Sequence, residues 1–181
     1  TDPSEKIDIT QTNIPKKYQS LPSVRIGSIA GLLELLETRQ NRDLYRLGQE
    51  LQLEVDDILP IVESAKLMDL IELREGDIYL EPIAFRFVEG NIDERKQIIR
   101  TQLLSHIRLV QQIYNLLKAK QNQRIPEELI LDILQNHFSP NEAQRQLDTA
   151  IDWGRYSELY SYDDPSGEIF LEETYSAQPF N

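Results

Sequence analysis

The strongest constraint on the fold of this 181-residue chain is an internal repeat. Residues 35–41 (LLETRQN) are echoed by residues 116–122 (LLKAKQN), and each segment lies in a stretch with helical apolar spacing. Further along, IYLE at residues 78–81 is echoed by IFLE at residues 169–172. Internal similarity of this kind indicates repeated structural units. We therefore predict two similar units in series.

The first unit is predicted to span residues 23–90 and to contain three helices and a hairpin. Apolar side chains recur at three and four residues, which places one stripe on each helix. The stripes are Ile26, Ile29, Leu32, Leu33 and Leu36 on a helix ending near Gln40 and Asn41; Leu44, Leu47 and Leu51 on a short helix capped by Asp43; and Ile58, Val62 and Ala65 on a helix from about Val55 to Leu67. Pro60 should strain or kink the third helix. The period then changes to two around residues 74–77 (REGD), where Gly76 suits a tight turn. This order is typical of a winged helix.

A long helical stretch is predicted to link the units. Asn91 followed three residues later by Glu94 is a capping signal for a helix start, and residues 91–106 form the predicted connector. An apolar stripe runs through the connector and beyond it, at Ile99, Leu103, Ile107, Val110, Tyr114 and Leu117. The spacing leaves open whether this stretch is one helix or two helices broken near His106.

The second unit is predicted to span residues 107–172. Pro126 suits the first turn of one helix, and Ser139, Pro140 and Glu142 combine an N-cap, a first-turn proline and a capping-box glutamate for the next. A second hairpin is expected around residues 163–167 (DDPSG). Residues 1–22 are predicted to be a linker, and residues 173–181 a flexible tail. The expected fold class is mainly α with small β-hairpins, in two winged-helix-like units joined by a helical connector.

The charge balance disfavours nucleic acid as a partner. The chain carries 31 acidic and 19 basic side chains, for a net charge of −12. Asp56 and Asp57 lie in the first turn of the third helix of the first unit, so this helix would meet DNA phosphates without releasing counterions. The corresponding helix of the second unit carries Glu142, Asp148 and Asp152 beside Arg145. A winged-helix transcription regulator is therefore only the third-ranked interpretation.

The sequence offers no recognisable catalytic, cofactor-binding or metal-binding residues. Cysteine is absent, and neither His106 nor His137 has a second ligand at metal-binding spacing. The acidic residues of the second hairpin lack the alternating oxygen pattern of a calcium loop. No phosphate-binding glycine loop is present. No apolar run reaches the roughly 18 residues that a membrane span needs, so direct membrane insertion is not expected.

One dense aromatic patch, residues 152–156 (DWGRY), has two interpretations. In the first, Trp153 and Tyr160 fill the core of the second unit and Gly154 lets the chain leave the helix. In the second, Trp153, Arg155 and Tyr156 form a recognition surface, because aromatic and Arg side chains often anchor protein contacts. Leu103, Ile107 and Val110 of the connector stripe are further candidates for a partner surface, unless they pack against the two units.

The residues of this patch also carry a family resemblance. Residues 150–156 (AIDWGRY), together with LPSVRIG at 21–27, LLELL at 32–36 and LEVDD at 53–57, resemble the C-terminal AAA-associated domain. The resemblance extends from about Leu21 to Leu171. This domain lies behind the nucleotide-binding domain in some ABC ATPases of the nitrate, sulfonate, taurine and bicarbonate type. A start at Thr1 without an initiator Met suggests a segment of such a longer protein.

The resemblance implies a parent protein that hydrolyses ATP, with magnesium, to drive anion uptake at the inner face of a membrane. The segment itself is then expected to be a cytoplasmic, non-catalytic regulatory or assembly domain without a cofactor of its own. Its expected partners are the ATPase core in cis and possibly a second copy of the chain. The alternative is a sensor domain that binds a small metabolite or anion between the two units.

Overall fold

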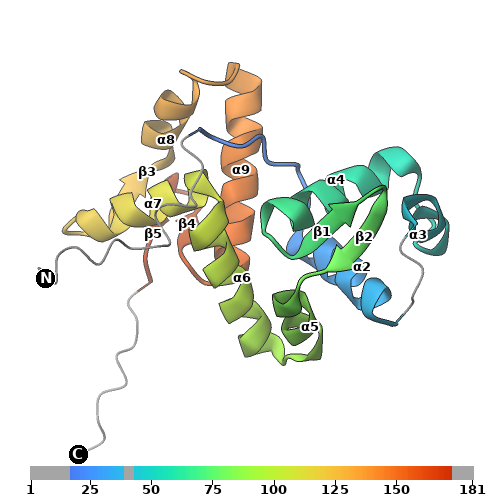
Figure 1. Ribbon diagram of the computed structural model, residues 1–181. Coiled ribbons are helices and arrows are strands. Elements are labelled where there is room, and N and C mark those ends of the chain that lie inside the picture. Colours follow the sequence, from blue (N-terminus) through green and yellow to red (C-terminus); the bar gives the residue numbers. More distant parts are fainter. Residues whose placement is uncertain (1–16, 39–42, 173–181) are drawn as a thin grey trace, which may run out of the picture.

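The computed structural model describes residues 17–38 and 43–172. Among these residues the chain is mainly helical, with one two-stranded and one three-stranded antiparallel sheet (Figure 1). This confirms the predicted fold class of a mainly α chain with small hairpins. The assignment of winged-helix geometry and the predicted domain boundaries stay predictions.

The first half of the described chain contains four helices and one hairpin. They are α2 (Ile26–Thr38), α3 (Leu44–Glu50), α4 (Val55–Leu67), β1 (Ile71–Arg74), β2 (Asp77–Leu80) and α5 (Pro82–Glu89). Asp43 caps α3 as predicted, because its side chain accepts a hydrogen bond from the Tyr45 amide at 2.8 Å. The hairpin turn uses Glu75 and Gly76, both with positive φ, which suits the twist of a two-residue hairpin. Helix α5 was not predicted.

The second half begins with two consecutive helices and ends with the three-stranded sheet. Its elements are α6 (Ile92–His106), α7 (Arg108–Ala119), β3 (Arg124–Pro126), α8 (Glu127–Leu134), α9 (Pro140–Tyr156), β4 (Ser161–Asp163) and β5 (Glu168–Phe170). The long helical stretch is therefore two helices, since the extended backbone of Ile107 (φ −107°, ψ 104°) ends α6. Strand β3, which was not predicted, pairs with β5 at the edge of the sheet.

The order of elements repeats between the two halves. The second half runs helix, strand, helix, helix, strand, strand, from α7 to β5. The first half runs α2, α3, α4, β1, β2, and the place of β3 is taken by an isolated bridge between Asp43 and Asp77. A three-residue strand or a single bridge carries too few residues to show a period of two in the sequence, so pattern alone did not reveal either feature.

Several predicted boundaries are met in the structure and others need correction. Asn91 caps α6 by accepting from the Glu94 amide at 2.9 Å, and Ser139 caps α9 by accepting from the Glu142 amide at 3.3 Å. Pro126 is the N-cap residue of α8 and the last residue of β3, not a first-turn residue. Helix α4 continues through Pro60. The predicted helix end at Gln40 and Asn41, the linker residues 1–16 and the tail 173–181 lie outside the described residues.

The hydrophobic core runs continuously through both halves. Figure 1 shows α2 to α4 with β1 and β2 on one side of α6 and α9, and α7, α8 and the three-stranded sheet on the other. One cluster of buried side chains includes residues from all of these helices. The buried Gln102 of α6 donates from its side chain to the Met68 carbonyl at 2.8 Å, which ties α6 to the end of α4. The two halves therefore share one interior.

Candidate functional site on helix α9

The structure places most of the predicted partner surface inside the molecule. Leu103, Ile107, Val110 and Trp153 are all 0% exposed. A partner cannot reach these side chains in the folded chain, so the idea that they form an exposed surface is wrong. The stripe is buried because α6 packs against α5 and α9, and α7 packs against α6, α9 and β3. Packing within the chain is the alternative left open by the sequence. Tyr114, at the same stripe, is partly buried.

Arg155 and Tyr156, at the C-terminal end of α9, remain accessible. Arg155 is exposed, and its guanidinium has no hydrogen bond or ion pair with any residue that the structure describes. Tyr156 is half-buried, and this burial raises the pKa of its phenol. Of the residues predicted to form a recognition surface, only these two are placed where a partner or ligand could touch them.

Gly154 serves a different purpose from the predicted one. It lies inside α9, which continues to Tyr156, so it does not let the chain leave the helix. The ring of the buried Tyr160 packs directly over it, and a Cβ at position 154 would overlap Tyr160 Cε2 and Cζ. The Tyr160 hydroxyl donates to the Ala150 carbonyl at 2.7 Å. Gly154 is therefore required for close packing of an aromatic ring on the helix.

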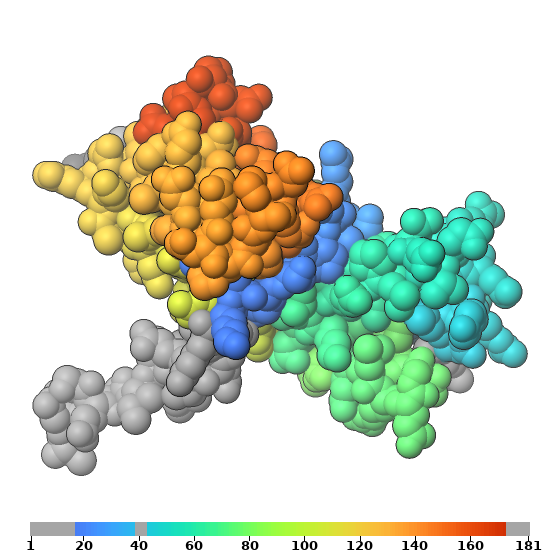
Figure 2. All heavy atoms as spheres, turned by 90° about the horizontal axis from the view of Figure 1, so that it is seen from above, coloured from blue at the N-terminus to red at the C-terminus, as the bar shows by residue number. Residues whose placement is uncertain are grey.

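Part of the predicted linker is bound to the protein as an extended strap. We call residues 17–25 the strap. In Figure 1 it crosses α9 and then enters α2, and Figure 2 shows the same blue residues between the orange α8 and α9 and the green first half. Leu21 is 4% exposed, so this segment contributes to the core. Its last residue, Arg25, accepts hydrogen bonds from the Ser28 and Ile29 amides at the start of α2.

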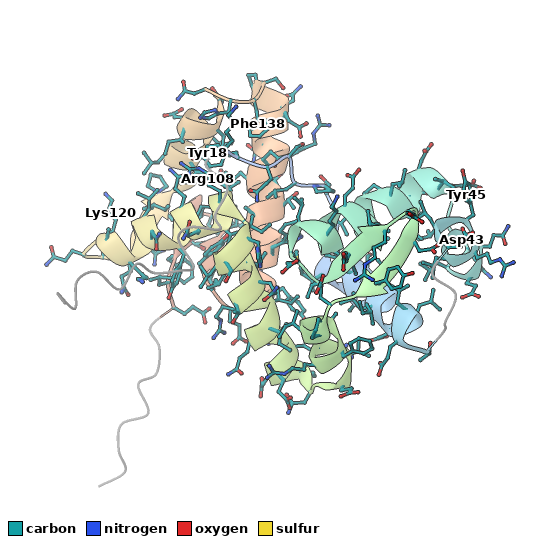
Figure 3. All side chains as sticks on the ribbon, in the orientation of Figure 1. Tyr18, Asp43, Tyr45, Arg108, Lys120 and Phe138 are labelled. Atoms are coloured by element: carbon teal, nitrogen blue, oxygen red, sulfur yellow. The ribbon has the colours of Figure 1, made fainter. Side chains whose placement is uncertain are left out.

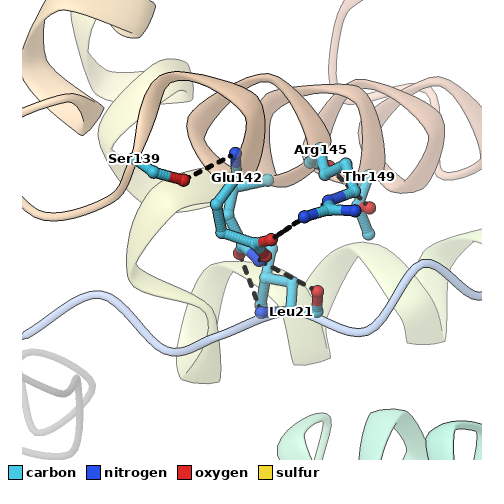
Figure 4. Close-up of polar contacts among 6 residues, drawn as sticks. Leu21, Ser139, Glu142, Arg145 and Thr149 are labelled. Carbon is cyan, nitrogen blue, oxygen red and sulfur yellow. Dashed lines mark hydrogen bonds and ion pairs between the residues drawn. The ribbon is translucent and has the colours of Figure 1, made fainter.

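Gln146 of α9 holds the middle of the strap. Its side-chain oxygen accepts from the Leu21 amide at 2.8 Å, and its side-chain nitrogen donates to the Leu21 carbonyl at 3.1 Å (Figure 4). The same nitrogen also donates to Glu142 at 3.0 Å, and Arg145 donates to the second oxygen of Glu142. The Glu142 side chain, predicted to close a capping box, is thus engaged with Gln146 and Arg145. Both hydrogen-bonding groups of the Leu21 backbone are satisfied by one buried side chain.

Two further contacts fix the ends of the strap. The indole nitrogen of Trp153 donates to the Val24 carbonyl at 2.7 Å, so the buried Trp153 serves both the core and the strap. At the other end, the Gln19 side chain donates to the His106 carbonyl and accepts from the Arg108 amide, which are the polar groups freed by the break between α6 and α7. Tyr18 donates to Gln112. Sequence reasoning missed Gln146, although a Gln at a buried position of an amphipathic helix is a detectable signal.

Aromatic contacts surround the first residues of the strap. Tyr18 lies edge-on to His137, with 5.1 Å between ring centroids, and the Arg108 guanidinium lies 5.4 Å from the Tyr18 ring centroid. Figure 3 shows Tyr18, Arg108 and Phe138 together in the half formed by α7 and α8, whereas Asp43 and Tyr45 lie at the far end of the other half. The strap therefore belongs mainly to the surface of the second half.

A polar cleft of about 690 Å³ lies beside the exposed end of α9. We call it the Arg155 cleft. It is lined by Arg100 of α6, by Tyr114 and Lys118 of α7, by Arg155 of α9, by residues 158–161, and by Gln123, Leu171 and Glu172 around the sheet. The cleft lies within the second half, between α6, α7, the end of α9 and the three-stranded sheet, and not between the two halves where the sensor interpretation expected a site. Local sequence patterns could not reveal this cleft, because its residues come from distant segments.

The charges of the Arg155 cleft are unusual for so acidic a chain. Arg100 donates from Nε to the Ser157 carbonyl at 3.0 Å, and the Lys118 ammonium lies 5.0 Å from the Tyr114 ring centroid. Glu158 is paired with Lys96 at 2.8 Å; this hydrogen bond, with a smaller contribution from the charge of Arg100, lowers the pKa of Glu158. Glu172 accepts from the Ser161 hydroxyl at 2.9 Å. The carboxylates thus have partners of their own.

A metal site and a membrane-spanning helix each place requirements on the described residues. No group of three or more His, Cys, Asp or Glu side chains within residues 17–38 and 43–172 is arranged to hold a metal. His106 lies 3.7 Å from Asp69, and Asp163 accepts from Ser166 within the hairpin. In the described part of the chain, no helix has both the length and the apolar character to cross a membrane.

Comparison with known proteins identifies the family. The model of the C-terminal AAA-associated domain matches residues 45–163, which include every element from α4 to β4 and thus more than half of the chain. No curated protein and no solved structure matches the chain. The matched residues contain the central helix α9 with its DWGRY sequence, on which the resemblance seen in the sequence was based. The chain therefore belongs to the C-terminal AAA-associated domain family.

Proposed function

We propose that this chain is a non-catalytic regulatory or assembly domain of an ATPase subunit in an ABC importer for anions of the nitrate, sulfonate or bicarbonate type. In this proposal, ATP and magnesium bind an ATPase core in the same polypeptide, and the domain lies with that core at the cytoplasmic face of the membrane. Membership of an AAA-associated family supports the link to an ATPase.

The strap is the observation that carries the proposal. It lies immediately before α2, and any domain attached through the N-terminal side of the chain would be connected through it. Leu21 and Val24 of the strap are hydrogen bonded to Gln146 and Trp153 of α9, while Arg25 caps α2. A force transmitted through the strap from an attached domain would therefore act on both halves together. This geometry suits a domain whose position depends on the state of an attached core.

The exposed end of α9 supplies a contact surface for the same role. Arg155 and Tyr156 are accessible there and combine a guanidinium with an aromatic ring, which is the composition of many interface anchors. In the proposal these two residues contact the ATPase core or a second copy of the chain.

The parent subunit provides the test. The ATPase rate of the purified parent is compared between wild type, Gln146→Ala and the matched variant Gln144→Ala, which changes an exposed glutamine on the same helix. We expect Gln146→Ala to change the ATPase rate while nucleotide affinity stays constant, and Gln144→Ala to behave as wild type. The isolated chain should release phosphate from ATP at the buffer rate. A parent without a nucleotide-binding domain, or an ATPase rate unaffected by removal of this domain, would contradict the proposal.

A further inference from the structure

We infer that the Arg155 cleft binds a small organic anion that carries a phosphate or carboxylate group. The inference depends on the residues of this cleft alone and not on the proposed parent protein. A role in ligand binding goes beyond a regulatory contact with an ATPase core, because it gives the domain an input of its own.

The first argument is the surplus of cationic groups. Arg100, Lys118 and Arg155 line the cleft from three different helices, and no ion pair between them and a carboxylate is formed among the described residues. Of the two carboxylates of the cleft, Glu158 forms an ion pair with Lys96, whereas Glu172 keeps its charge and accepts a hydrogen bond from the neutral Ser161 hydroxyl, so the cleft holds three cationic groups against one carboxylate without an ion pair. Three cationic side chains that line one cleft and form no ion pair give it a local positive excess in a chain with a net charge of −12. An anion in the cleft would relieve their mutual repulsion.

The second argument is the geometry of the donors. Arg100 uses Nε for the Ser157 carbonyl, which holds its guanidinium in place and leaves both terminal nitrogens for another acceptor. Arg155 brings a second guanidinium. Planar guanidinium groups bind carboxylate and phosphate through pairs of parallel hydrogen bonds, which are among the stronger polar contacts in proteins. Lys118 adds a third positive charge, held near the Tyr114 ring.

The third argument is size and the nature of the walls. About 690 Å³ is far more than a single phosphate ion fills and lies within the range of metabolite-binding pockets. Tyr114, Leu159 and Leu171 give the cleft an apolar side that a purely inorganic ion would leave uncovered. An organic anion would place its charged group near the cationic side chains and its carbon skeleton against the apolar side. A polyanion such as nucleic acid is disfavoured, because the chain as a whole carries a net charge of −12.

Binding at this place would connect three elements. The donors belong to α6, α7 and the end of α9, so a bound anion would hold the two consecutive helices α6 and α7 against α9. Because Gln102 of α6 also donates to the Met68 carbonyl of the first half, a ligand that holds α6 in place would also affect the contact between the two halves.

Calorimetric titration of the full chain tests the inference. The probes are citrate, adenosine monophosphate and inorganic phosphate, each at constant ionic strength set with sodium chloride. Arg155→Gln is the main variant, since Arg155 is exposed and has no structural partner among the described residues. Lys118→Gln is the second variant. Arg145→Gln is the matched control, because Arg145 is an exposed arginine near the other end of the same helix. Thermal melts of all variants check the fold.

We expect saturable binding of citrate or adenosine monophosphate at one site, tighter than that of inorganic phosphate. Arg155→Gln and Lys118→Gln should weaken this binding by about tenfold or more, the usual effect of losing a charged hydrogen bond. Arg145→Gln should leave it unchanged. Absence of saturable binding for all three probes, equal weakening by Arg145→Gln, or inorganic phosphate binding as tightly as the organic anions would overturn the inference.

Discussion

The aromatic ring of Tyr160 occupies the space in which a side chain at position 154 would have to lie. We expect Gly154→Ala to destabilise the protein, although Ala favours helix, because the new Cβ would overlap Cε2 and Cζ of a fully buried ring and would lie 2.7 Å from its hydroxyl oxygen. Overpacking of this kind costs about 1–3 kcal/mol. Chemical denaturation measures the change in the free energy of unfolding.

Gly31→Ala is the matched control for this change. Gly31 also lies inside a helix, α2, but a Cβ added there meets no atom within 4 Å. The control should leave the protein unchanged or stabilise it by up to about 1 kcal/mol, the difference in helix propensity between Gly and Ala. If the two variants were equally stable, the packing of the Tyr160 ring would not require a glycine at position 154.

Tyr162 allows a prediction about pH. Its hydroxyl donates to Glu127 at 2.8 Å, and this hydrogen bond, together with burial, raises the pKa of Tyr162 to about 12. An unfolded tyrosine titrates near pH 10. Because the folded pKa is the higher one, the stabilising contribution is complete below about pH 10 and is lost as pH rises towards about 12. Glu127→Gln should lower the pKa of Tyr162 in an NMR titration of its ring carbons. Glu128→Gln, a neighbouring exposed change on α8, should not.

The strap shows how one side chain can determine the path of an extended segment. Gln146→Ala would leave the amide and carbonyl of the buried Leu21 without their partner, and an unsatisfied buried backbone group costs about 1–3 kcal/mol. We expect faster hydrogen exchange across residues 17–25 and a lower free energy of unfolding. Mass spectrometry of the exchanged peptides measures the first effect and chemical denaturation the second.

Gln144→Ala controls for the loss of a glutamine from α9. Gln144 is exposed and binds only Asp148 of the same helix among the described residues, at 2.8 Å. Exchange across the strap should be unchanged in this variant. If Gln146→Ala also left the strap protected, Gln146 would not be what holds it.

Sequence patterns predicted the elements that have a strong period or a clear cap. Helix α4 begins at Val55 and ends at Leu67 as expected, and the caps at Asp43, Asn91 and Ser139 were all located from residue type and spacing. The local pattern could not reveal β3, whose pairing depends on β5 more than forty residues later. It also could not show that a polar segment such as the strap would dock, because this depends on Gln146 in a distant helix.

The candidate site was less predictable than the fold for the same reason. Arg155 was identified because it lies in a distinctive local sequence, but Arg100 and Lys118 join it only after α6, α7 and α9 pack together. The buried stripe of Leu103, Ile107 and Val110 looked like a surplus apolar surface because the sequence does not show that the two halves share one interior. Both the assembly of the cleft and the burial of the stripe depend on tertiary packing, which local sequence patterns do not show.

The continuity of the core between the two halves leads to the last prediction. Leu103→Glu would place a carboxylate at a position that is 0% exposed, in the last turn of α6 and within the apolar core. An unpaired buried charge costs about 3–5 kcal/mol, a large share of the stability of an ordinary domain. We expect a thermal melt with a strongly lowered midpoint or no cooperative transition. Ile92→Glu is the control, because Ile92 lies on the same helix and is 71% exposed; its melt should match wild type. Light scattering on the same samples measures the molecular mass in solution. If the Leu103→Glu variant melted like wild type and only its mass changed, the prediction would be wrong and the stripe would be an interface between subunits.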